Sequence, residues 1–122
     1  ARIDSNSMTK TGIAMGTPNY ISPEQLRGLS TDRRADLFSL GVVMYELLLG
    51  RRPFRGENIT SLIYSIMNVE PDKPSQVNSH VPMLFDHIVS RSLKKDPNER
   101  YQKANEIVAD LQAFVESFMV RV

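Results

Sequence analysis

The run from Thr31 to Gly50 constrains the fold of this chain more than any other segment. Between Leu40 and Leu49 almost every side chain is apolar. The exceptions are Gly41, Tyr45 and Glu46. A helix that is apolar around its whole circumference is buried on all sides, and this one is shorter than the roughly 20 residues that cross a bilayer. We therefore expect the central helix of a globular domain, capped by Thr31 or Asp32 and stopped by Gly50.

Helical patterns cover most of the remaining chain. Ser22 can cap a short helix that begins at Pro23 and stops at Gly28. Apolar residues repeat at the spacing of one helix face in three later segments. These helices are expected over residues 59–67, from Pro82 to Lys95, and around Ile107–Phe118. Residues 1–20 are expected to form a long loop and 72–81 an irregular linker, and no segment alternates like a strand, so the predicted fold class is all-α.

Composition narrows the classes of function. The chain has 122 residues, enough for one domain, and its 15 basic and 14 acidic residues nearly balance, which gives no support to a nucleic-acid or membrane-surface partner. Cysteine is absent, so thiolate metal sites are excluded, and we interpret His80 and His87 as surface or hydrogen-bonded core residues rather than metal ligands. No stretch is apolar enough to span a membrane. The start at Ala1 lacks methionine and a signal segment, so we expect a soluble, cytoplasmic fragment whose parent can be membrane-anchored elsewhere.

Three segments carry a resemblance to a known family. Gly16–Gln25 is similar to the end of an activation segment, with Ser22-Pro23-Glu24 written where the family has A-P-E. Arg34–Leu47 is similar to that family's central helix, and Leu93–Tyr101 to the turn before its last helix. The chain thus resembles the C-terminal lobe of eukaryotic-type (Hanks-type) serine/threonine protein kinases, bacterial members in particular. The resemblance implies the helical lobe of a kinase fold whose parent domain is α+β.

The family's chemical machinery has no counterpart in this sequence. The G-x-G-x-x-G loop, the V-A-I-K lysine, the H-R-D catalytic loop and the D-F-G triplet are all missing. The resemblance implies ATP and Mg²⁺ as cofactors of the parent kinase. Because phosphoryl transfer depends on the residues that position these groups, we expect this chain alone to bind no ATP and to be inactive, with no catalytic residue of its own.

The resemblance divides the chain into residues 1–21, an activation segment with a substrate-facing loop, and residues 22–122, a helical subdomain. It assigns substrate binding to a short loop. The residues of that loop are Gly16, Thr17, Pro18 and Tyr20. Thr17 resembles the family threonine that supports the catalytic aspartate of the missing loop. An ordinary turn threonine is the alternative interpretation.

Four hydroxyl residues lie where the family has its activation-loop phosphorylation sites. The T-x-T spacing of Thr9 and Thr11 favours these two over Ser5 and Ser7. A hydrophilic loop with no modification explains the same residues. A phosphate orders a loop only where arginines receive it, and the main arginine is expected in the missing catalytic loop.

A further set of residues is expected to have structural roles. Ser22 and Pro23 start the first helix, and the resemblance pairs Glu24 with Arg100 as a buried ion pair. It also assigns to Asp36 the acceptance of backbone hydrogen bonds from the missing catalytic loop. The alternatives are two solvated charges for the pair and, for Asp36, an acid that interacts with a helix N-terminus.

Two classes of function remain open. The first is a part of a kinase that recognises protein substrates through Gly16–Tyr20 and the helix over 59–67. The second is a non-catalytic pseudokinase or scaffold that binds partners through the same helices, and an unrelated helical bundle is a third interpretation. Without upstream elements, the Leu37–Leu49 helix should expose an apolar patch, so we expect self-association or a swap of the N-terminal segment between copies.

Overall fold

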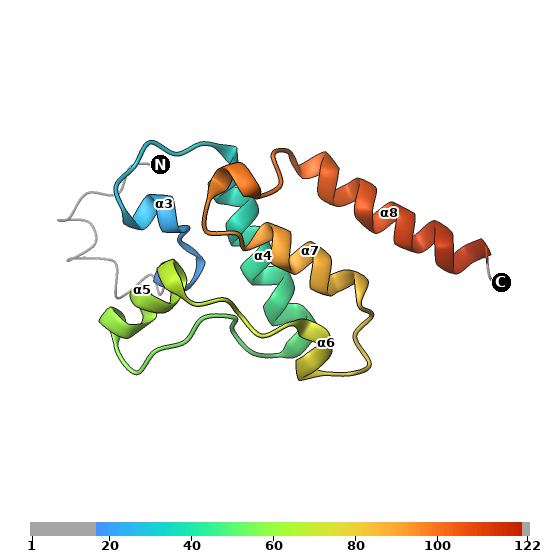
Figure 1. Cartoon of the computed structure of the whole chain (residues 1–122), viewed down its shortest axis with the longest axis horizontal. Helices are drawn as coiled ribbons and strands as arrows, with labels where there is room; N and C mark the ends of the chain where they lie inside the picture. The colour runs from blue at the N-terminus through green and yellow to red at the C-terminus, as the bar shows by residue number, and fades with distance from the viewer. Residues whose placement is uncertain (1–16, 121–122) are drawn as a thin grey trace.

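The computed structural model of the chain describes residues 17–120 and contains no strand in that range. A 3₁₀ turn, η2 (Thr17–Tyr20), leads into α3 (Pro23–Leu26) and then into the long central helix α4 (Arg33–Leu49). The later elements are α5 (Ile59–Asn68), α6 (Pro74–Val77), α7 (Leu84–Ser92), η3 (Pro97–Glu99) and α8 (Ala104–Val120). The all-α prediction is confirmed. Figure 1 shows the other helices arranged around α4.

The ends of α4 follow from two residues. Asp32 accepts a hydrogen bond from the backbone N–H of Arg34 and caps the N-terminus, where unpaired amides favour a carboxylate. Gly50 adopts the left-handed conformation, with φ 67°, and its N–H donates to the carbonyl of Glu46. Because only glycine takes this conformation without steric strain, the helix stops there as expected.

Two apolar clusters pack against different sides of α4. The larger one includes Phe38 and Val42, whose side chains are fully buried. Its other members are Tyr45, Phe54, Ile66, Val89 and Leu93. The second is made of Leu37, Ile88, Tyr101 and Ile107. Since both clusters draw on residues from several helices, α4 is the common core of the bundle.

One face of α4 contradicts the expectation that the helix is buried on all sides. Leu40, Val43 and Leu47 are 41%, 39% and 80% exposed. The described helices pack on the remaining faces, so this face has no cover within residues 17–120. The apolar patch expected for the helix is therefore present.

Several local expectations need correction. Residues 17–20 form a 3₁₀ turn rather than loop. The 72–81 linker contains the short helix α6, and α7 begins at Leu84 rather than Pro82. Pro74 is at the start of α6, where its missing N–H is tolerated, so a proline that suggested an irregular linker instead opens a helix.

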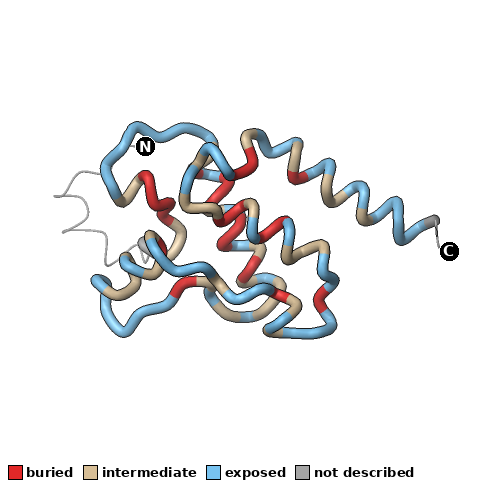
Figure 2. Tube along the Cα trace, in the orientation of Figure 1, coloured by how far each residue is buried: buried red, intermediate tan, exposed pale blue. Residues whose placement is uncertain are grey.

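The last helix, α8, projects away from the bundle (Figure 1). Its first turns contribute Ile107 to the core, whereas residues 115–119 are all exposed. Figure 2 shows this change along the helix. No helix within residues 17–120 has the length and hydropathy needed to cross a membrane.

Gly41 lies at a tight contact between α4 and the C-terminal end of α7. A Cβ added there would lie 2.6 Å from the Ser92 Cβ and 2.9 Å from the Leu93 Cδ2. We expect Gly41→Ala to lower the free energy of unfolding by up to about 2 kcal/mol, because a gain of roughly 1 kcal/mol in helix propensity offsets only part of an overpacking cost of about 1–3 kcal/mol. Urea unfolding measures this change.

The double variant Gly41→Ala/Ser92→Gly provides the control, because it removes the Cβ that the new methyl group meets. The loss caused by Gly41→Ala should be smaller in the Ser92→Gly background than in the parent chain. Equal losses in both backgrounds would contradict the close contact.

Candidate functional site

A buried ion pair connects α3 to the turn before α8. The Arg100 Nη1 donates to the Glu24 Oε2 at 2.7 Å, and Nη2 donates to Oε1 at 3.0 Å. The two side chains are only 0% and 6% exposed. This two-bond geometry between a guanidinium and a carboxylate is the strong form of the interaction. The pair expected from the sequence therefore forms, across 76 positions of sequence.

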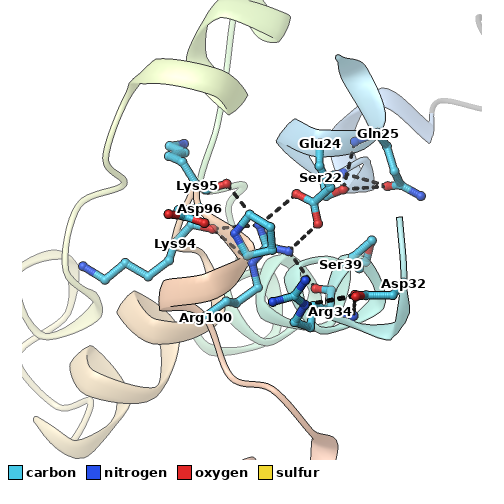
Figure 3. Close-up of polar contacts among 12 residues, drawn as sticks. Ser22, Glu24, Gln25, Asp32, Arg34, Ser39, Lys94, Lys95, Asp96 and Arg100 are labelled. Carbon is cyan, nitrogen blue, oxygen red and sulfur yellow. Dashed lines mark hydrogen bonds and ion pairs between the residues drawn. The ribbon is translucent and has the colours of Figure 1, made fainter. Parts of the chain in front are cut away.

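Arg100 has an acceptor for each of its remaining N–H groups (Figure 3). Nη1 also donates to the carbonyl of Arg34 at 2.7 Å, and both Nε and Nη2 donate to the carbonyl of Lys94, at 3.0 and 2.9 Å. The guanidinium carbon lies 5.0 Å from the centre of the Phe38 ring. Because a buried charge is tolerated only when it is paired and fully hydrogen-bonded, one side chain joins α3, α4 and the turn before α8.

Two effects oppose each other at Glu24. Burial raises the pKa of this carboxyl, whereas the hydrogen bonds from Arg100 and the charge of its guanidinium lower it, and the net result is a pKa below the usual 4.5. The carboxylate is thus charged at neutral pH and holds its partner.

The start of α3 places Glu24 in the right position. Ser22 accepts a hydrogen bond from the backbone N–H of Gln25 at 3.3 Å, and the Gln25 side chain accepts from the Ser22 N–H at 2.9 Å. This reciprocal capping box fixes the first turn. Pro23 occupies the first helical position, where the restricted φ angle of proline suits a helix. The S-P-E triplet therefore presents its acid toward the core.

The η2 turn is attached to α4 at two points. The Ser39 Oγ donates to the backbone carbonyl of Tyr20, and the Tyr20 hydroxyl donates to the Glu46 Oε2 at 3.3 Å. Burial and the hydrogen bond to Glu46 raise the pKa of Tyr20, so its hydroxyl is protonated at neutral pH. The other carboxylate oxygen of Glu46, Oε1, is buried without a hydrogen bond among the described residues.

Sequence reasoning did not identify Ser39 and Glu46 as functional candidates. The two residues are seven positions apart, about two helical turns, and so lie on the same side of α4. This spacing is the one sequence feature that could have indicated a shared role. Their partner Tyr20 was identified, but its position against α4 was not.

A second cation in the same turn, Lys95, was also missed. Its Nζ donates to the carbonyls of Ile66 and Ser65 at 2.6 and 3.3 Å and lies 4.0 Å from the centre of the Phe54 ring. These carbonyls belong to the C-terminal turn of α5, where a positive charge is favourable. Burial lowers the pKa of Lys95 to about 8. The turn that contains Arg100 thus contacts α5 as well as α3.

The other candidates lie apart from this arrangement. Asp36 is exposed in the first turn of α4, and no described residue pairs with its carboxylate. His80 and His87 are exposed. Among residues 17–120 no group of His, Asp and Glu side chains is arranged to hold a metal ion. Gly16 and the phosphorylation candidates Ser5, Ser7, Thr9 and Thr11 lie outside the described residues, and of Thr17 and Pro18 only the backbone turn is described.

Comparison with known proteins defines the class. The family model described as "Protein kinase domain" matches residues 2–111, so the chain belongs to the protein kinase family. The resemblance drawn from the three sequence segments is confirmed.

Curated relatives narrow this class to serine/threonine kinases of bacteria. The chain is 44% identical over 108 residues to the serine/threonine-protein kinase PknB of Mycobacterium leprae, and 43% identical over 106 residues to PknB of Mycobacterium tuberculosis (strain ATCC 25618 / H37Rv). It is 36% identical over 110 residues to the probable serine/threonine-protein kinase CPE1738 of Clostridium perfringens. These matches cover 88%, 87% and 90% of the chain but only 17%, 17% and 16% of the relatives.

Removing the guanidinium tests how much the buried pair stabilises the fold. Arg100→Ala should lower the free energy of unfolding by about 3–5 kcal/mol, because it strands the Glu24 carboxylate in the core. Arg51 and Asp72 provide a matched control, since their ion pair has a 2.9 Å contact but side chains 33% and 69% exposed. Arg51→Ala should cost at most about 1 kcal/mol. Similar losses in the two variants, measured by urea unfolding, would contradict the account.

Proposed function

We propose that this chain is the activation segment and helical base of a serine/threonine protein kinase, which transfers the γ-phosphate of ATP to serine or threonine of protein substrates. Membership of the protein kinase family supports the proposal, as does the similarity to bacterial proteins named as serine/threonine-protein kinases. Because the chain spans about one sixth of those relatives, activity and substrates belong to the complete protein.

The observation that carries the proposal is the attachment of the Thr17–Tyr20 turn to α4. Ser39 holds the backbone of Tyr20 and Glu46 holds its hydroxyl, while the Glu24–Arg100 pair fixes α3 immediately after the turn. A loop that positions a substrate must itself be rigid, because small misplacements slow the reaction. The two hydrogen bonds to Tyr20 and the buried ion pair at Glu24 provide that rigidity.

The roles of individual residues follow from this position. We assign substrate binding to Gly16, Thr17, Pro18 and Tyr20, with Thr17 supporting the catalytic aspartate of a complete domain. The exposed face of α5 around Ile59 extends the surface for protein substrates. Thr9 and Thr11, ahead of Ser5 and Ser7, are the proposed phosphorylation sites, and Asp36 is the proposed anchor for the catalytic loop.

The assignment of cofactors follows from the sequence. It contains neither the glycine-rich loop nor the lysine that bind the phosphates of ATP in this family. We therefore assign ATP and Mg²⁺ to the complete kinase domain. The chain alone should be inactive.

Two further properties are part of the proposal. The exposed Leu40, Val43 and Leu47 face of α4 is where the rest of a kinase domain would pack, so the isolated chain should self-associate there, with or without exchange of its N-terminal segment. The kinase domain is proposed to lie in the cytoplasm, whether or not the complete protein has a membrane anchor.

Phosphate transfer tests the proposal directly. The complete kinase domain that contains this segment should transfer label from γ-labelled ATP, with Mg²⁺, to serine or threonine of a protein substrate, and the 122-residue chain alone should not. Failure of the complete domain to transfer label would favour the alternative, a pseudokinase or scaffold. Transfer by the chain alone would contradict the assignment of the chemistry to other residues.

A variant of the complete domain tests the anchored turn. Tyr20→Phe should raise KM for the protein substrate roughly fivefold, equivalent to about 1 kcal/mol for one hydrogen bond, and leave KM for ATP unchanged. Tyr45→Phe is the matched control, because it removes a hydrogen bond from the same helix to the Asp72 carbonyl, away from the turn. Equal effects of the two variants on the protein-substrate KM would contradict a positioning role for Tyr20.

A further inference from the structure

Helix α5 is attached to the rest of the fold by few contacts of its own. Of its ten residues only Ile66 is buried, whereas Ile59 and Tyr64 are 53% and 63% exposed. Its N-terminus is held by residues next to it in sequence, because Asn58 and Ser61 form a reciprocal capping box. A helix of this length is marginal in water by itself, so contacts from other elements must set its position.

Lys95 supplies such a contact at the opposite end of the helix. Its Nζ donates to the carbonyls of Ile66 and Ser65 at 2.6 and 3.3 Å and lies 4.0 Å from the centre of the Phe54 ring. Both carbonyls belong to the C-terminal turn of α5, where the helix dipole favours a cation. The ammonium therefore holds the backbone of α5 at its single buried residue.

The backbone of Lys95 is in turn bound to the buried ion pair. Its carbonyl accepts from the Arg100 Nη2 at 3.3 Å, and the same nitrogen donates to the Glu24 Oε1 at 3.0 Å (Figure 3). Two neighbouring cations of one turn thus connect α3, which contains Glu24, to α5. Since α5 contacts both α3 and η2, this turn fixes α5 relative to α3 and to the η2 turn that precedes it.

The charge of Lys95 is not needed to fill space. Burial lowers the pKa of Lys95 to about 8, so the ammonium is held there at a cost in free energy, although most of it stays charged at neutral pH. Methionine also has a long unbranched side chain and would fill the space without that cost, but it has no N–H donors for the α5 carbonyls. The ammonium is therefore better explained by the geometry that it imposes than by net stability.

We propose that Lys95 is a positioning residue for protein substrates, which sets the spacing between α5 and the η2 turn by holding the C-terminal turn of α5. The inference rests on the proposed function, in which both elements bind the protein substrate. A protein that contacts the two surfaces together binds more tightly when their spacing is fixed, because α5 does not have to be ordered on binding. A short peptide that covers only the η2 turn gains nothing from α5.

Substitution of Lys95 in the complete kinase domain tests the inference with two substrates. One is the protein substrate of the phosphate-transfer experiment, and the other is a short peptide copied from around its phosphorylated residue. Lys95→Met should raise KM for the protein roughly fivefold and leave kcat, KM for the peptide and KM for ATP unchanged. Lys94→Met is the matched control and should behave as the parent. Lys94 is the adjacent lysine and is also half-buried, but its side chain makes no hydrogen bond or ion pair with residues 17–120.

Hydrogen exchange measures the attachment of α5 independently of activity. In Lys95→Met the backbone amides of α5 should exchange about tenfold faster than in the parent domain, whereas those of α7 should be unchanged. Lys95→Arg keeps the positive charge and has donors for both carbonyls. It should therefore restore slow exchange in α5 and the parent's KM for the protein substrate.

The outcomes separate this inference from the proposed function. A parent domain that phosphorylates neither substrate contradicts the proposed function, and exchange in α5 then remains the test of the attachment. The role of Lys95 is overturned if Lys95→Met behaves like Lys94→Met, if it raises KM for protein and peptide alike, or if Lys95→Arg restores nothing. A Lys95→Met domain that circular dichroism shows to be unfolded would overturn it too, because Lys95 would then act on stability alone.

Discussion

The structure depends on a charge that is removed from water. Arg100 is fully buried, and such a charge is tolerated only when every N–H has an acceptor. Glu24 in α3 and the carbonyl of Arg34 in α4 provide acceptors from 76 and 66 positions away in sequence, and the carbonyl of Lys94 provides one from the turn that contains Arg100. These segments must therefore come together for the chain to fold. The ion pair acts as a geometric requirement more than as a source of net stability.

The central helix α4 is the element to which most of the other segments attach. Different sides of this helix pack against the two apolar clusters. It also approaches α7 closely at Gly41 and holds the η2 turn through Ser39 and Glu46. The turn before α8 adds Lys95, which closes the end of α5. The η2 turn, α7 and the turn before α8 are thus all held in place by contacts that converge on α4 and its neighbours, so a change in one of them affects the others.

The sequence predicted α4 well because its signals are local. Asp32 and Gly50 act on adjacent backbone groups and set the two ends of the helix. The apolar run between them predicts that the helix lies at the centre of the fold. The Glu24–Arg100 pair was predicted only through the family resemblance, since no periodicity connects residues 76 positions apart. Sequence reasoning did not identify Ser39, Glu46 and Lys95. Their partners are a backbone carbonyl, a tyrosine hydroxyl and the end of a helix, and only the fold brings these groups near. The exposed side of α4 was predicted by considering which elements would cover this helix. The apolar pattern alone does not show which face is left uncovered.

The measurement that tests the account most directly is the pH dependence of unfolding in the parent chain and in Glu24→Gln. The folded state lowers the pKa of Glu24 below 4.5, so its stabilising effect is present above the unfolded pKa and is lost as the pH falls through the folded pKa. Other carboxyl groups titrate in both proteins and cancel in the difference. The stability difference between the two proteins should be constant from about pH 7 to pH 6 and shrink steadily below about pH 4.5. A difference that is absent at neutral pH, or that does not change on acidification, would contradict the central role of the buried pair.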